Sequence, residues 1–122
     1  MQSPEAVVRS FCTAWERRDI PTILDFFSDD AVYHNMPLAP VSGKDGIEEV
    51  LHLFVLPAEK IRFEILHLLS QGNLVLTERV DHFTISGKEI ALPVAGVFEL
   101  RDGKIVAWRD YFDFATWQRA SA

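Results

Sequence analysis

The stretch IALPVAGVFELRDGKIVAWRDYFDF, residues 90–114, decides the fold class of this 122-residue chain. Two segments rich in aliphatic and aromatic residues flank the pair Asp102-Gly103, which is typical of the tight turn between antiparallel strands. The pattern predicts one strand over residues 90–101 and another from Ile105 to about Phe114.

Two more strands are predicted upstream of this hairpin. Residues 61–65 alternate apolar and charged side chains, and residues 74–84 form a longer segment of strand character. Turn residues at 71–73 and at Ser86-Gly87 separate these segments. A short β-like segment over residues 31–36 stops at Pro37, and residues 37–43 are expected to form a loop.

The first half of the chain shows helical periodicity instead. Ser3 and Pro4 suit the start of a helix over residues 3–18, where apolar residues recur every three or four positions. Asp19 begins a shorter predicted helix that ends at residues 28–30, and a third helix runs from Ser42 or Gly43 to about Leu56.

Helices followed by a meander of strands predict a single α+β domain over residues 1–122. We expect the helices to pack on one face of a curved, mostly antiparallel sheet. A curled sheet covered by helices leaves a cone with one open mouth, which is a natural pocket for a small molecule.

The composition narrows the classes of function. Hydrophobic residues make up 48% of the chain, and 12 Lys and Arg against 18 Asp and Glu give a formal net charge of −6. Binding to nucleic acid or to an anionic membrane requires a basic face, so we expect neither partner. The sequence shows no targeting segment and no apolar run of the roughly 18 residues that a membrane span requires, so a cytoplasmic location is expected.

Neither a metal nor a cofactor is expected. Cys12 is the single cysteine, which excludes an internal disulfide and a multi-cysteine metal site. The four histidines lack the spacing of metal ligands and are interpreted as structural or surface residues. The sequence contains no phosphate-binding loop, dinucleotide fingerprint or nucleophile-elbow motif.

The residues that could carry chemistry lie on strand faces that otherwise have the composition of a core. Arg79 and Asp81 are two positions apart and share one face of their strand. Asp110 lies on the last strand, and Tyr33 and Asn35 share a face of the short first strand. Other residues predicted on the faces of Arg79 and Asp110 are Val75, Thr77, Phe83, Val106, Trp108 and Phe112.

Two carboxylates close together in an apolar setting cannot both stay charged at low cost, and an arginine between them relieves the repulsion. Asp81 and Asp110 could then hold different protonation states, so that one acts as an acid and the other as a base at the same pH. Tyr33 and Asn35 could bind a water molecule without adding charge. A structural interpretation stays open, because Arg-x-Asp on a strand is often a surface ion pair that contributes little stability.

Four segments together resemble limonene-1,2-epoxide hydrolase: Tyr33-His34-Asn35, Glu78-Arg79-Val80-Asp81, residues 92–99 (LPVAGVFE) and residues 108–113 (WRDYFD). The motif needs Tyr-x-Asn, Arg-x-Asp and Trp-x-Asp on three separate strands in that order. The order of helices and strands also resembles the broader nuclear-transport-factor-2-like superfamily, whose fold is described as cystatin-like. That resemblance covers nearly the whole chain and implies a six-stranded curved sheet with helices enclosing a deep pocket.

The resemblance implies an enzyme that adds water to a small apolar epoxide and yields a vicinal diol in one concerted step, without a covalent intermediate. Asp110 would be the general base on a water that Tyr33 and Asn35 also hold, and Asp81 would be the general acid. Arg79 would bridge both carboxylates. The family also implies a homodimer. The residues expected to line the substrate pocket are Phe83, Leu92, Val94, Trp108 and Phe112.

Two alternative functions remain open. A ketosteroid-isomerase-like or polyketide-cyclase-like enzyme of the same fold would need neutral donors at an oxyanion, such as Tyr33 beside a protonated aspartate. Arg79 argues against this chemistry, because a buried guanidinium keeps a neighbouring acid ionised. A non-catalytic small-molecule-binding or dimerisation domain would leave the polar residues exposed and unconnected.

Overall fold

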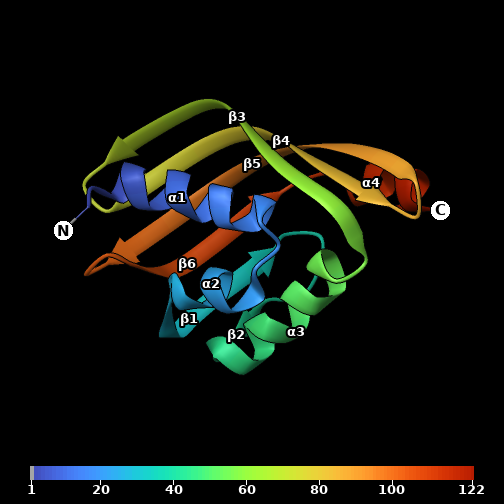
Figure 1. Cartoon of the computed structure of the whole chain (residues 1–122). Helices are drawn as coiled ribbons and strands as arrows, with labels where there is room; N and C mark the ends of the chain where they lie inside the picture. Colours follow the sequence, from blue (N-terminus) through green and yellow to red (C-terminus); the bar gives the residue numbers. More distant parts are fainter. Residues whose placement is uncertain (1) are drawn as a thin grey trace.

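In the computed structural model, residues 2–122 form four helices and six strands (Figure 1). In chain order these are α1 (Pro4–Glu16), α2 (Ile20–Asp25), β1 (Phe27–Asn35), β2 (Val41–Ser42), α3 (Gly43–Val55), β3 (Ala58–Gln71), β4 (Leu74–Ile85), β5 (Lys88–Arg101), β6 (Lys104–Tyr111) and α4 (Phe114–Ser121). Each helix within residues 2–122 is too short or too polar to cross a membrane.

The strands form one mixed sheet in the order β2-β1-β6-β5-β4-β3. β1 runs parallel to β6, and all other neighbouring strands among residues 2–122 are antiparallel. The sheet is curled, and Figure 1 shows α1 lying across it while α2 and α3 cover the end that carries β1. The expected α+β architecture with a mostly antiparallel sheet is therefore confirmed.

Aromatic side chains fill the space between α1 and the sheet. Phe11 of α1 meets Trp108 of β6 edge to face, with ring centroids 4.9 Å apart. Trp15, one turn later, stacks on Phe63 of β3 at 4.9 Å. All four residues are buried, and they fix the helix against the sheet over the strands that carry the polar residues.

Several local signals act as the sequence predicts. Ser3 caps α1 by accepting the amide N–H of Ala6 at 3.1 Å, and Asp19 caps α2 by accepting that of Thr22 at 3.3 Å. Asp102 and Gly103 have φ values of +51° and +77°. Positive φ at both central residues is the mark of the two-residue turn that matches strand twist, so the predicted hairpin forms.

The structure differs from the sequence prediction in the first strand. β1 begins at Phe27, which the periodicity assigned to the second helix, and not at residue 31. The pairing of β1 with β6 is interrupted between Phe27 and Val32, so residues 28–30 bulge out of the ladder, with Asp29 and Asp30 exposed. Asp30 pairs there with Arg101 at 3.0 Å. The turn-like composition of residues 28–30 therefore reflects this bulge and not the end of a helix.

Three further elements escaped the prediction. β2 lies in the predicted loop. β3 extends well beyond residues 61–65, and the prediction stopped there because a register shift between Ile65 and His67 interrupts the alternation of the strand. α4 replaces the predicted end of the last strand. Its signal was Asp113, whose carboxylate accepts the amide N–H of Ala115 at 3.2 Å and the hydroxyl of Thr116 at 2.9 Å.

The inward face of β6 also needs one correction. Trp108 and Asp110 are buried as predicted, but Val106 is only half-buried and Ile105 takes its place in the core. The reason is a bulge, because Leu100 pairs with Ile105 while Glu99 pairs with Ala107. At this bulge, two positions along β6 correspond to one position along β5. The alternation of inward and outward side chains in β6 is therefore reversed before Trp108.

Candidate active site

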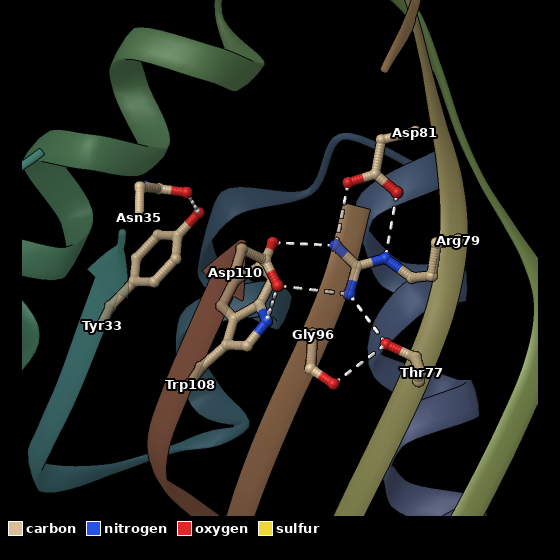
Figure 2. A network of polar contacts seen from close by, with 8 residues as sticks. All are labelled: Tyr33, Asn35, Thr77, Arg79, Asp81, Gly96, Trp108 and Asp110. Carbon is tan, nitrogen blue, oxygen red and sulfur yellow. Dashed lines mark hydrogen bonds and ion pairs between the residues drawn. The ribbon is translucent and has the colours of Figure 1, made fainter. Parts of the chain in front are cut away.

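The guanidinium of Arg79 lies between the carboxylates of Asp81 and Asp110 (Figure 2). Nε and Nη2 of Arg79 donate to the two oxygens of Asp81 at 3.0 and 2.9 Å. Nη2 and Nη1 donate to the two oxygens of Asp110 at 2.8 and 3.3 Å. Arg79 and Asp81 come from β4, while Asp110 comes from β6, so the arginine spans the intervening strand β5.

Thr77 completes the set of contacts around the arginine. Nη1 of Arg79 also donates to Oγ1 of Thr77 at 3.0 Å. A guanidinium has five N–H groups, and the five hydrogen bonds to Asp81, Asp110 and Thr77 match that number. The guanidinium carbon also lies 5.1 Å from the ring centre of Phe63 and 5.9 Å from that of Trp108. These aromatic neighbours favour a cation while excluding water.

The three charged side chains are removed from solvent. Their exposed fractions are 0% for Arg79, 5% for Asp81 and 6% for Asp110. Burial raises the pKa of Asp110 to about 6, although Arg79 acts in the opposite direction. Burial lowers the pKa of Arg79, but the two carboxylates outweigh it and raise that pKa well above its usual value. Arg79 therefore stays charged, and Asp110 can gain or lose a proton near neutral pH.

Trp108 lies behind Asp110 and not on the wall where the sequence analysis placed it. Its indole Nε1 donates to Oδ1 of Asp110 at 2.7 Å. The side chain is fully buried and does not line the cavity described below. The prediction assigned Trp108 to the wall because alternation gives the face of a residue but not its depth. Its large ring fills the core between α1 and the sheet.

Tyr33 and Asn35 lie on the side of Asp110 and not on the side of Asp81 (Figure 2). The parallel pairing of β1 with β6 sets Asn35 beside Asp110 and Tyr33 beside Trp108. The rings of Tyr33 and Trp108 stack at 4.3 Å, and the Tyr33 hydroxyl donates to Oδ1 of Asn35 at 3.3 Å. Burial and the charge of Asp110 raise the pKa of Tyr33 well above its usual value, so its hydroxyl keeps its proton.

A small cavity opens in front of these polar groups. Four of the five residues predicted to line a substrate pocket are on its wall, namely Phe83, Leu92, Val94 and Phe112. The residues of the whole lining are Trp15, Tyr33, Asn35, Phe54, Phe63, Asp81, Phe83, Leu92, Val94, Asp110 and Phe112. An apolar wall around two carboxyls and two neutral polar groups is typical of a site for a small, largely apolar molecule.

Three wall residues, Trp15, Phe54 and Phe63, were not predicted as lining. Their sequence signal is the apolar periodicity of α1, α3 and β3, which looks the same whether a side chain meets a cavity or another side chain. α4 supports this wall through Trp117, whose ring lies 5.3 Å from those of Phe54 and Phe83.

The remaining titratable residues singled out in the sequence lie elsewhere. His34 contacts the carbonyl of Leu38 at 2.9 Å, and His82 contacts Glu64 at 2.9 Å, both away from the carboxyl pair. Cys12 is buried, and burial raises the pKa of its thiol to about 12, so it is not a nucleophile at neutral pH. No cluster of three or more His, Cys, Asp or Glu side chains suited to a metal ion occurs within residues 2–122.

Comparison with known proteins finds similarity to epoxide hydrolases in sequence and in structure. The family model for the limonene-1,2-epoxide hydrolase catalytic domain matches residues 2–122. Epoxide hydrolase EphG of Mycobacterium tuberculosis is 34% identical over 108 residues, which cover 87% of this chain and 70% of that protein. A solved LEH-like epoxide hydrolase from M. tuberculosis is 32% identical with a TM-score of 0.77, covering 95% of this chain and 90% of that one.

More distant structures share the fold alone. A SnoaL-like protein from Shewanella putrefaciens has a TM-score of 0.87 at 18% identity, covering 99% of this chain and 97% of that one. The fold is therefore the one common to SnoaL-like and nuclear-transport-factor-2-like proteins.

Proposed function

The chain belongs to the limonene-1,2-epoxide hydrolase family, and on this premise we propose that it hydrolyses an apolar epoxide to a vicinal diol in one concerted acid–base step. The observation that supports this mechanism most strongly is Arg79 between Asp81 and Asp110, buried beside an apolar cavity. Such a cluster can hold one carboxyl protonated and the other ionised at the same pH.

Asp110 is the general base in this proposal. Tyr33 and Asn35 lie on its side of the cluster (Figure 2), and in the proposal the three residues together hold the attacking water. The pKa of about 6 leaves Asp110 ionised at neutral pH and makes it a stronger base than an exposed carboxylate. Its water attacks one epoxide carbon while the proton of that water passes to Asp110.

Asp81 is the general acid, on the other side of Arg79. As the carbon–oxygen bond of the epoxide breaks, Asp81 gives its proton to the leaving oxygen, which avoids a free alkoxide. The water hydroxyl has then joined one carbon, and the epoxide oxygen has become the second hydroxyl. Asp110 now holds the proton taken from the water and Asp81 is ionised, so the transfer of one proton from Asp110 to Asp81 restores the starting state. Arg79 stays charged throughout and stabilises whichever carboxylate is ionised.

Two alternatives receive less support. A ketosteroid-isomerase-like reaction would use the same carboxyl pair as a base and an oxyanion donor, but the family model and the curated relative are those of epoxide hydrolases. A non-catalytic binding domain would place these groups apart on the surface, whereas they are buried and connected.

Limonene-type specificity, a homodimer and a cytoplasmic location are also part of the proposal. The outer face of the sheet exposes four leucines, and Leu69 pairs with Leu76 across β3 and β4. An apolar surface of this kind suits contact with a second copy of the chain. The exposed leucines are Leu66, Leu69, Leu74 and Leu76. Analytical ultracentrifugation tests the dimer. The wild-type chain should sediment as a dimer and Leu76→Glu as a monomer, and a monomeric wild type would rule the dimer out. Fractionation of the native host tests the location.

Product analysis of the purified protein tests the function. Racemic limonene oxide and styrene oxide, supplied with a chelator present, should both give diols, and limonene oxide should be the faster substrate. In single turnover in water enriched with heavy oxygen, the diol should carry the label. Label in an aspartate would indicate an ester intermediate and exclude the concerted mechanism. Absence of diol from a panel of apolar epoxides would exclude the function.

A further inference from the structure

The inward face of β5 has a gap at Gly96. The other residues of this row, Ile90, Leu92, Val94, Phe98 and Leu100, are all large and buried. Gly96 pairs directly with Thr77 of β4 on one side and with Asp110 of β6 on the other. It therefore lies beneath the path that the Arg79 side chain takes from β4 to Asp110 (Figure 2).

A side chain at Gly96 would occupy the place of the guanidinium. A Cβ atom built on Gly96 collides with Nη1 of Arg79, and lies 2.7 Å from Oδ1 of Asp110 and 2.9 Å from Oγ1 of Thr77. In protein structures, a Cβ atom essentially never lies within 3.0 Å of a heavy atom to which it is not bonded. Gly96 does not have a positive φ, so its backbone conformation is one that residues with a side chain adopt readily. The glycine is needed for space and not for conformation.

Thr77 takes the one N–H of Arg79 that the carboxylates leave. Its Oγ1 accepts from Nη1 at 3.0 Å and lies 3.5 Å from the carbonyl oxygen of Gly96. The hydroxyl therefore holds Nη1 above the gap, while Asp81 holds the opposite side of the guanidinium. Without this acceptor, a buried N–H of a charged group would lack a partner, which is costly.

We propose that Gly96 and Thr77 are positioning residues, which place the guanidinium of Arg79 within reach of both carboxylates. Gly96 provides the space and Thr77 provides the anchor. The inference rests on the proposed hydrolase mechanism, because its consequence for rate depends on Arg79 coupling a base to an acid. Neither residue lines the cavity, so both act through Arg79 and not on the substrate.

Four variants test the proposal, each compared with wild type by circular dichroism and thermal unfolding. Gly96→Ala should lower kcat by about 100-fold with little change in KM, because a displacement of about 1 Å in a positioned group can cost that much. Thr77→Val should lower kcat by about tenfold, while Thr77→Ser keeps the hydroxyl and should retain most of the rate. Gly46→Ala is the control for an added methyl group, because its Cβ lies an ordinary 3.5 Å from that of Val41.

The pH profile separates positioning from a general structural defect. The titratable groups facing Asp110 are Arg79 and Asp81 of β4, Tyr33 of β1 and Cys12 of α1. The raised pKa values of Tyr33 and Cys12 keep both neutral, so Arg79 is the one cation near Asp110 among the described residues. Moving Arg79 away should therefore raise the pKa of Asp110, and the acidic limb of kcat/KM should shift to higher pH in Gly96→Ala but not in Gly46→Ala.

Wild-type kcat and an unshifted acidic limb in Gly96→Ala would overturn the proposal. If that variant does not fold, equal rates for Thr77→Val and Thr77→Ser would overturn it instead. Should wild type hydrolyse no epoxide, the proposed function fails, but a titration of the Asp110 carboxyl carbon by NMR still decides this inference. An upward shift of its pKa in Gly96→Ala supports the positioning role, and an unchanged pKa excludes it.

Discussion

The indole of Trp108 holds the carboxylate of Asp110 from two positions earlier on the same strand, with Nε1 2.7 Å from Oδ1. The same oxygen accepts from Nη1 of Arg79 at 3.3 Å, so it is fixed from two directions. Oδ2 contacts Nη2 of Arg79 at 2.8 Å. The proposed base is thus oriented by two side chains that do not line the cavity.

Trp108→Phe should lower kcat by about 10- to 100-fold, the loss expected for one hydrogen bond to a charged group. Because this bond lowers the pKa of Asp110, the acidic limb of the rate profile should also move to higher pH. Trp15→Phe is the control for the acidic limb alone, because Trp15 lines the cavity but its Nε1 has no hydrogen-bond partner in the part of the chain that the structure describes. An identical acidic limb in wild type and Trp108→Phe would contradict the orienting role.

The rate itself should depend on pH through Asp110. As the proposed base, Asp110 must be ionised, so kcat/KM should rise with pH and level off above about 6. Stopped-flow or discontinuous assays across pH 4–8 measure this limb. A rate that falls as pH rises through this range would require Asp110 to act in its protonated form, and would exchange the roles of the two aspartates.

The free energy of unfolding should fall as pH rises, whereas the rate should increase. Folding raises the pKa of Asp110 from 3.8 to about 6, so the folded state binds this proton more tightly than the unfolded state. The stabilisation is complete below the unfolded value and is lost as pH rises through the folded value. The free energy of unfolding of wild type should therefore fall relative to Asp110→Asn between pH 4 and 6. Denaturant titrations at several pH values measure this difference, and a constant difference would contradict it.

Asp81→Asn and Asp110→Asn should each lower kcat by about 100- to 10,000-fold, the range of general acid–base catalysis. An amide has nearly the shape of a carboxyl but cannot supply or accept the catalytic proton. Near-native circular dichroism serves as the control for folding. Wild-type turnover in either variant would contradict the assigned mechanism.

Trp117→Ala should loosen the wall that α4 supports. Its ring contacts Phe54 and Phe83, both of which line the cavity. We expect KM for small epoxides to rise and bulkier epoxides to become substrates, while Trp117→Phe keeps most of the contact and behaves like wild type. KM measured across a series of epoxides of increasing size tests this, and an unchanged series in Trp117→Ala would remove α4 from the pocket.

Much of the site could be predicted because it lies on regular strands. Strict alternation along β4 places Arg79 and Asp81 on one face, and no bulge interrupts β4 against β5. Alternation gave the right face for Trp108 and Asp110, but the wrong one for Val106, since the bulge near Leu100 is a tertiary feature of two paired strands. A sequence pattern read along one strand contains no information about its partner's register.

The depth of a residue was harder to predict than its face. Trp108 and Phe83 both point inward, yet one fills the core and the other lines the cavity. That difference depends on how α1, α3 and α4 cover the sheet, which is set by packing between distant segments. Gly96 escaped notice for a related reason, because a glycine in a strand shows its purpose only when the neighbouring side chain is in place.

Because β4 contributes Thr77, Arg79 and Asp81 at alternate positions, the register of this strand has an all-or-none effect on the site. A slip by one residue would send all three side chains outward and bring Glu78, Val80 and His82 inside. Catalytic assembly is then inseparable from correct strand pairing. The return of turnover during refolding would therefore report that β4 and β5 have paired in their native register.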